Sequence, residues 1–365
     1  TILMGAVHDF GALVMSVKEK GKSIADIAST TISKRARLMF LIFIILLVWL
    51  VLAVFAMAVA DLFVGIPSSV IPINIEIIIA IIMGYLIYKK KMDILIPSLI
   101  ALALLYFFVW VGTKAPVDFT EVMPAQDAKN LWIILLFIYS AIASLLPVWT
   151  LLQPRDYINS HQLIVGLGLL FLGIFVAQPI VDAPALRSFS EPGVPSLFPL
   201  LFVTVACGAI SGFHGLVASG TSSKQLEHLS DARMVGYGGM IGEGTLALAT
   251  TVAAVAGISL VAQSDIPNYS VAVSGLNNWE VYYDTWAHAS GNKTAAFVLG
   301  GGELLQSLGI SKSFAETLMS VLIISFAATT LDTATRIQRL ILNEFGAATN
   351  IKPLSNRYIA TIIAI

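Results

Sequence analysis

"LMFLIFIILLVWLVLAVFAMAVA" occupies Leu38–Ala60 and contains no charged residue over its 23 positions. At about 1.5 Å per residue, a helix of this length crosses a hydrocarbon core of about 30 Å. Helices satisfy their own backbone hydrogen bonds, which a bilayer requires. Further apolar runs lie at Ile71–Tyr88, Ile94–Gly112, Leu131–Leu152, Leu163–Val181, Leu197–Val217, Met234–Ala262, Ala295–Ile310 and Phe314–Leu331. The sequence therefore predicts an all-α, polytopic transmembrane helical bundle with the lipid bilayer as its surroundings.

Composition excludes several classes of function. Of the 365 residues, 57% are hydrophobic and 12% charged, against about 25% charged residues in soluble domains. The formal charge of −1 leaves no basic footprint for a nucleic-acid partner. One cysteine allows no internal disulfide and no multi-cysteine metal cage. His214 and His228 form no HExxH motif, and no P-loop occurs. We expect no metal, no cofactor and no ATP-driven transport.

The distribution of Lys and Arg predicts the orientation. Placing Lys18–Arg37 on the cytoplasmic side also brings Lys89–Lys91, Arg155, Lys224, Arg233 and Arg336–Arg339 to that side. This arrangement requires that one of the runs Ala295–Ile310 and Phe314–Leu331 does not cross. Ala295–Ile310 is shorter and contains "GGGE", so we expect either a re-entrant half-helix or a short helix on the outer surface.

The chain ends suggest an incomplete transmembrane domain. It begins at Thr1 without Met and ends in "YIATIIAI", which reads as an unfinished helix. We interpret residues 1–365 as a fragment of a single transmembrane domain, with residues 263–293 as an extracytoplasmic loop. The sequence carries no signal for oligomeric state.

The segment "CGAISGFHGLVASGTSSKQL", Cys207–Leu226, interrupts an apolar run with glycines and polar side chains. Gly208 and Gly212 form a small-xxx-small pair that would serve close helix packing. The alternative is a helix unwound near the membrane midplane, where freed carbonyls and half-helix ends hold substrate and ions. The glycines Gly208, Gly212, Gly215 and Gly220 would permit the break, and the polar residues Ser211, His214, Ser219 and Thr221 would line a substrate pathway.

His214 and Glu243 are expected at the same depth. His214 precedes Lys224 by ten residues and Glu243 follows Arg233 by ten, so each lies about 15 Å inside the cytoplasmic boundary. Their helices could pack as an antiparallel pair. A carboxyl at that depth must be neutral, paired or hydrated, and is by default a functional candidate. The alternative is a protonated Glu243 bonded to a neighbouring helix carbonyl. Glu76 is a second, lower-ranked intramembrane acid.

Two polar clusters lie near the inner surface. "TTLDTATRIQR" places Asp332 four residues before Arg336, the spacing of a helical ion pair, and Asp332 would also suit an N-cap of the following helix. Contact of Asp332 with transported cargo is the alternative. "QPRDYINS" begins with Pro154, read as ending a helix, and its Arg155 and Asp156 either pair across an inner gate or face water. Arg336 is a further gate candidate.

Several stretches resemble the carbon starvation protein A family of prokaryotic membrane transporters. They are "GAVHDFGALVMSVKEKGKSI", "LPVWTLLQPRDYINS", "ACGAISGFHGLVASGTSSKQL", "DARMVGYGGMIGEG" and "FAATTLDTATRIQRLILNEF". The resemblance implies multi-pass insertion in the plasma (inner) membrane and ion-driven uptake of peptides or pyruvate. It also implies kinship with the LeuT-like, broken-helix inverted-repeat transporters. The family's N-terminal "FGHHF" and "GPLVGP"-like motifs are absent from this chain.

The expected function is a proton-coupled secondary carrier and not an enzyme. The broken segment would contact the cargo, Glu243 would take up a proton and His214 would tune it, with Na⁺ as the alternative coupling ion. Two other readings remain: a passive channel for small organic anions, and an intramembrane protease. The protease reading is weak because "VASG" and "AISG" lack the leading glycine of Gly-x-Ser-Gly, and no Gly-x-Gly-Asp occurs.

Overall fold

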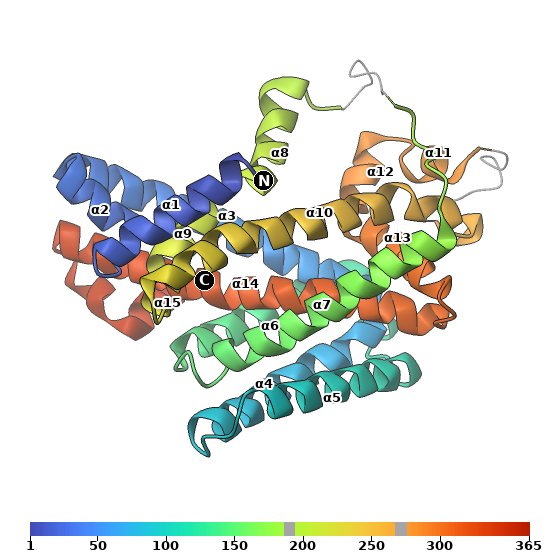
Figure 1. Cartoon of the computed structure of the whole chain (residues 1–365), viewed down its shortest axis with the longest axis horizontal. Helices are drawn as coiled ribbons and strands as arrows, with labels where there is room; N and C mark the ends of the chain where they lie inside the picture. Colours follow the sequence, from blue (N-terminus) through green and yellow to red (C-terminus); the bar gives the residue numbers. More distant parts are fainter. Residues whose placement is uncertain (186–193, 267–275) are drawn as a thin grey trace.

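The computed structural model describes residues 1–185, 194–266 and 276–365, and these ranges contain helices and no β-strand (Figure 1). Part of the predicted loop 263–293 lies outside them. Within the described residues, seven helical segments are long and apolar enough to cross a membrane: Lys34–Gly65, Pro67–Tyr88, Leu95–Glu121, Ala125–Leu145, Leu152–Ala177, Leu229–Leu260 and Lys312–Thr349. The predicted all-α transmembrane bundle is confirmed.

The first half of the chain forms helices α1 to α7. They are α1 (Met4–Lys18), α2 (Ile24–Thr31), α3 (Lys34–Gly65), α4 (Val70–Tyr88), α5 (Leu95–Lys114), α6 (Ala125–Leu145) and α7 (Leu152–Ala177). The Ser33 side chain accepts from the backbone N–H of Ala36 and so caps α3 where the long apolar run begins. Helices α4 and α5 form a hairpin at one edge of the bundle (Figure 1).

The run Leu197–Val217 is broken, as predicted. Helix α8 (Phe202–Ala209) ends where Ile210 (φ −140°, ψ 77°) and Ser211 leave the helical conformation, and α9 (Gly212–Gly220) begins directly after them. In Figure 1, α8 rises away from the main helix direction, whereas α9 lies beside α1. A π-helical segment, Arg233–Gly238, then leads into α10 (Gly239–Val255).

In the described part of the chain between α10 and α14, one end of the bundle contains the short helices α11 (Asn278–Tyr282), α12 (Trp286–Gly291) and α13 (Lys293–Gln306). With 14 residues, α13 is about 21 Å long and is too short to cross. Its glycines allow close packing: a Cβ at Gly300 would collide with the backbone of Ala253 and Gly257 in and after α10. Because α7, α10 and α14 all pack against it, α13 is embedded in protein, as a re-entrant helix would be.

Helix α14 (Lys312–Thr349) is the centre of the bundle. Of the residues in its most apolar window, 67% are buried, against 50% or less in the other six spans. It packs against α3, α5, α6, α7, α13 and the C-terminal α15 (Arg357–Ala364). The predicted crossing Phe314–Leu331 is therefore part of a helix of 38 residues, about 57 Å long.

Candidate functional site

A cavity of about 920 Å³ lies between α1, α3, α9 and α10. This volume is within the range of small-molecule sites in proteins. Its apolar wall includes Leu50, Val51, Val54 and Phe55 of α3. Its polar lining includes Asp9, Ser211, His214, Ser222, Glu243 and, from α14, Thr330. The three predicted residues Ser211, His214 and Glu243 thus share one cavity.

Two carboxylates meet one imidazole in this cavity. His214 Nδ1 lies 3.0 Å from Asp9 Oδ2 and 3.6 Å from Glu243 Oε2. Asp9 also lies 2.7 Å from the imidazole of His8. The Asp9 side chain is 9% exposed, whereas His214 and Glu243 are about one-third exposed. Because two negative groups surround one imidazole, the cluster favours an added proton or another positive charge.

The expected equal depth of His214 and Glu243 is confirmed by their contact. The expectation that their two helices form a simple antiparallel pair is wrong, because α1 packs against both α9 and the π segment before α10. Gly236 makes this possible: a Cβ there would lie 2.9 Å from Phe10 Cα of α1. The inserted α1 brings Asp9 to the imidazole.

The other predicted pathway residues of α9 lie away from the cavity lining. Ser219 and Thr221 are at the end of the helix opposite its break. The carbonyl of Ser219 accepts hydrogen bonds from Ser16 and Ser223. This end of α9 is therefore fastened to α1 through serine side chains, a packing role.

The glycines flank the break and do not form it. The non-helical residues are Ile210 and Ser211, between Gly208 and Gly212. Among the described residues, nothing lies within 4 Å of a Cβ placed at Gly208, Gly212 or Gly220, so the small-xxx-small packing alternative finds no neighbour here. A Cβ placed at Gly215, by contrast, would lie 3.2 Å from the imidazole of His8.

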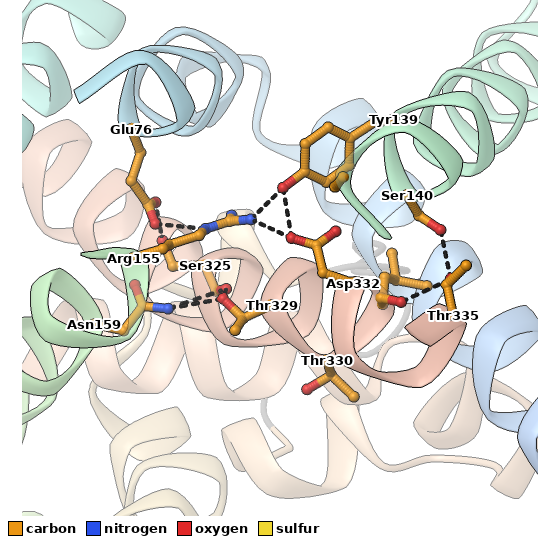
Figure 2. A network of polar contacts seen from close by, with 12 residues as sticks. Glu76, Tyr139, Ser140, Arg155, Asn159, Ser325, Thr329, Thr330, Asp332 and Thr335 are labelled. Carbon is orange, nitrogen blue, oxygen red and sulfur yellow. Dashed lines mark hydrogen bonds and ion pairs between the residues drawn. The ribbon is translucent and has the colours of Figure 1, made fainter. Parts of the chain in front are cut away.

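A second polar site is buried on the other side of α14 (Figure 2). The side chains of Glu76 and Arg155 are completely buried and Asp332 is 1% exposed. Arg155 donates from Nε to Glu76 Oε1 at 2.9 Å, and its Nη1 lies 3.4 Å from Asp332 Oδ2. Tyr139 accepts from Arg155 at 2.7 Å and donates to Asp332 Oδ2 at 2.7 Å. One guanidinium therefore joins α4, α6, α7 and α14.

Neutral hydrogen bonds extend this site along α14. Ser325 Oγ donates to Glu76 Oε2 at 2.5 Å, and Asn159 donates to Thr329 Oγ1 at 2.9 Å. Ser140 and Thr335 pair at 2.6 Å between α6 and α14. These contacts occupy one face of α14, whereas Thr330 points away from the network in Figure 2 and lines the cavity.

The structure corrects the interpretation of the segment around Arg155. Pro154 lies in the first turn of α7, where a missing N–H is tolerated, and does not end a helix. Arg155 does not face water or pair with Asp156. It lies in the core with partners 79 and 177 residues away in sequence, whereas Asp156, the next residue, is exposed.

The structure also contradicts two expectations for Asp332, namely that it caps the following helix and that it pairs with Arg336. Asp332 lies inside α14 and caps no helix. It pairs with Arg155 instead of Arg336. Arg336 donates to the carbonyl of Ala143 at 2.5 Å and Arg339 to that of Ser144 at 2.8 Å, so both bind the C-terminal end of α6.

Sequence reasoning missed Asp9 and Tyr139 as candidate functional residues and gave too little weight to Glu76. Asp9 is an acid inside the apolar segment before Lys18, and this position in the sequence could have indicated a functional carboxyl group. Glu76 is more buried than Glu243, although the sequence favours Glu243 as the intramembrane acid. Tyr139 gave no signal, because a tyrosine in an apolar run is common near membrane interfaces.

The bundle, its buried ion network and its polar cavity define a class: a multi-pass membrane protein with polar sites among its helices. The sequence profile of the family described as carbon starvation protein CstA matches residues 1–365. The chain belongs to this family. The bacterial relatives and the seven apolar helices identify it as a multi-pass plasma-membrane protein of a prokaryote. No solved structure matches the chain.

Curated relatives carry transporter names. A peptide transporter CstA of Mycobacterium tuberculosis is 37% identical over 258 residues, covering 68% of this chain and 33% of the relative. A peptide transporter CstA of Escherichia coli is 36% identical over 266 residues, 69% of this chain and 37% of the relative. The pyruvate/proton symporter BtsT of Escherichia coli is 34% identical over 262 residues, which cover 69% of this chain and 36% of the relative. The matched region thus spans about a third of the length of each of these proteins. Their names do not favour a protease or a passive channel.

Proposed function

We propose that this chain is part of a secondary active transporter that imports a peptide or pyruvate across the plasma membrane during carbon starvation, driven by protons. The printed names of the relatives support both cargo classes and, for one relative, proton symport. The observation that carries the proposal is the contact of His214 with Asp9 and Glu243 inside the 920 Å³ cavity. A carrier needs such a meeting of a substrate-sized space with groups that bind and release protons.

Each part of the cavity has a role in this proposal. The backbone freed at Ile210 and the hydroxyl of Ser211 contact the cargo at the start of α9. Glu243, which is reachable from the cavity, takes up the proton. His214 tunes that event by sharing its Nδ1 between Glu243 and Asp9, because a positive imidazole stabilises either carboxylate.

We also propose that the fold is a LeuT-like inverted repeat. The break between α8 and α9 supports a LeuT-like inverted repeat, in which discontinuous helices form the midplane site. A structure of the full-length protein tests it. Two halves related by an axis in the membrane plane are expected, with the α8–α9 break near that axis. Halves without such a relation would refute the assignment.

Uptake into proteoliposomes tests the function. The full-length protein is reconstituted, and entry of labelled pyruvate or a labelled dipeptide is followed with and without an inward proton gradient. At a gradient of one pH unit, each coupled proton supports about tenfold accumulation, because tenfold corresponds to about 1.4 kcal/mol. Glu243→Gln removes one proton and is expected to lower accumulation about tenfold.

The matched control is Glu227→Gln, because the Glu227 side chain is 86% exposed and lies outside the cavity lining. It should accumulate cargo like the wild type. Accumulation that follows a sodium gradient and ignores pH and Glu243 would overturn proton coupling. Entry of either cargo that never exceeds its outside concentration would indicate a passive channel.

A further inference from the structure

The buried ion network carries unequal charge. Its members Glu76, Arg155 and Asp332 are at most 1% exposed, and they supply two carboxyl groups and one guanidinium. With all three ionised, the network has a net charge of −1. An uncompensated charge in a dry interior is strongly unfavourable, so a buried group of this kind takes up a proton or a counter-ion.

Among the described residues, Arg155 is the one cation in contact with the two carboxyl groups. The groups that act on Asp332 include Arg155 and Asp156 of α7, Tyr139 of α6, Glu76 of α4 and, along α14 itself, Arg336. Arg336 donates to the Ala143 carbonyl, and the described residues place no cation other than Arg155 in contact with Asp332. Helix α3, which also packs on α14, carries its charged residues near its two ends. His214 of α9 faces the cavity.

The two carboxyl groups are not equivalent. Both oxygens of Glu76 have partners, since Oε1 accepts from Arg155 and Oε2 from Ser325. Asp332 Oδ2 accepts from Tyr139, whereas its Oδ1 is buried without any hydrogen-bond partner. The guanidinium is also farther from Asp332, at 3.4 Å, than from Glu76, at 2.9 Å. A proton added at Asp332 Oδ1 therefore breaks no contact and makes the network neutral.

We propose that Asp332 is a second proton-binding site of the transport cycle, separate from the cavity site around Glu243. Asp332 carries the proton on Oδ1 in the arrangement seen here, in which the network is buried. When water reaches the network, the O–H bond breaks, the proton passes to water, and the carboxylate left behind attracts Arg155 more strongly. The inference rests on the proposed proton-driven transport, because that function gives the second proton its use.

Helix α14 connects the two sites. It presents Asp332 and Ser325 to the network and Thr330 to the cavity from an opposite face (Figure 2). Since Arg155 ties α14 to α4 and α7, a change of charge at Asp332 alters the force that holds this cavity wall. Occupancy of the cavity and protonation of Asp332 therefore act on the same helix.

The transport test uses Asp332→Asn in the reconstituted full-length protein, with the cargo that the wild type accumulates. Asn has the shape of the neutral acid and cannot release a proton. Exchange of labelled for unlabelled cargo at equal pH should stay close to the wild-type rate. Accumulation at a gradient of one pH unit should fall about tenfold, because one coupled proton is lost. Wild-type accumulation in Asp332→Asn would overturn the inference.

Two further variants separate charge from packing. Glu76→Gln balances the network, leaving Arg155 with the Asp332 carboxylate, and should lower accumulation like Asp332→Asn. Ser140→Ala removes only the neutral bond between α6 and α14, three residues from Asp332 along α14 at Thr335, and should accumulate like the wild type. If Ser140→Ala and Asp332→Asn lose exchange and accumulation alike, the network is structural and the inference fails.

Infrared spectroscopy of the purified full-length protein gives an answer independent of transport. The wild type at neutral pH should show the absorption of a protonated buried carboxyl, and Asp332→Asn and Glu76→Gln should both lack it. Retention of that band in Asp332→Asn would overturn the inference. Failure of the wild type to accumulate either cargo would refute the proposed function while leaving this spectroscopic result to decide the state of Asp332.

Discussion

Replacing Arg155 by Met should destabilise this protein more than loss of any surface ion pair. The guanidinium lies 2.9 Å from Glu76, 3.4 Å from Asp332 and 2.7 Å from the Tyr139 hydroxyl. At an effective dielectric constant of about 20, the ion pair with Glu76 corresponds to about 6 kcal/mol of attraction, whereas a protonated Asp332 adds a polar contact and no second ion pair. The guanidinium's own desolvation offsets much of this, and breaking a buried pair typically costs about 3–5 kcal/mol. That is a large part of a total stability of about 5–15 kcal/mol.

Unfolding of the full-length protein by SDS in mixed micelles measures the effect. Arg155→Met should lower the free energy of unfolding by about 3–5 kcal/mol. The triple variant Arg155→Met, Glu76→Gln, Asp332→Asn should recover at least half of the loss, because it leaves no unpaired buried charge.

The surface comparison is Lys129→Met, which removes the partly exposed pair with Asp61. Loss of such a pair should cost about 1 kcal/mol or less. The reasoning is refuted if Arg155→Met costs no more than Lys129→Met. It is also refuted if the triple variant is no more stable than the single one, since the loss would then be one of packing and not of charge.

Two further predictions concern Gly300 in α13 and the ion pair of Asp265 with Lys312. Gly300→Ala should destabilise the protein by about 1–3 kcal/mol through overpacking, because a Cβ at this position meets the backbone of Ala253. The control variant Gly168→Ala should not destabilise it, because a Cβ at Gly168 meets open space. Thermal unfolding of both variants measures the difference. The hydrogen bond from Lys312 holds the pKa of Asp265 below its ordinary value. The stabilisation this pair adds is therefore present above that ordinary value and lost as the pH falls through the lowered one. A stability difference between wild type and Lys312→Met that persists at the lowest pH would contradict it.

The apolar runs were sufficient to predict where most helices lie. Leu38–Ala60 became the centre of α3, and "GAISG" marked the break between α8 and α9 within a residue or two. Both are local properties: a long uncharged segment must form a helix in lipid, and a cluster of glycines and hydroxyls weakens one. The equal depth of His214 and Glu243 also followed locally, because it needs only the helical rise and the nearest charged residues.

Pairing between distant residues required the folded chain. Asp332 and Arg336 are four residues apart, the spacing of a helical pair, yet Asp332 faces Arg155, 177 residues earlier in sequence. The burial of α14 among its neighbours decides this, because a carboxyl on that face is removed from water and must pair with a cation that another helix brings. In the same way, Asp9 reaches His214 only because α1 packs against both α9 and the segment before α10. Spacing along the chain determines which face of a helix a residue occupies, and packing between helices determines what that face meets.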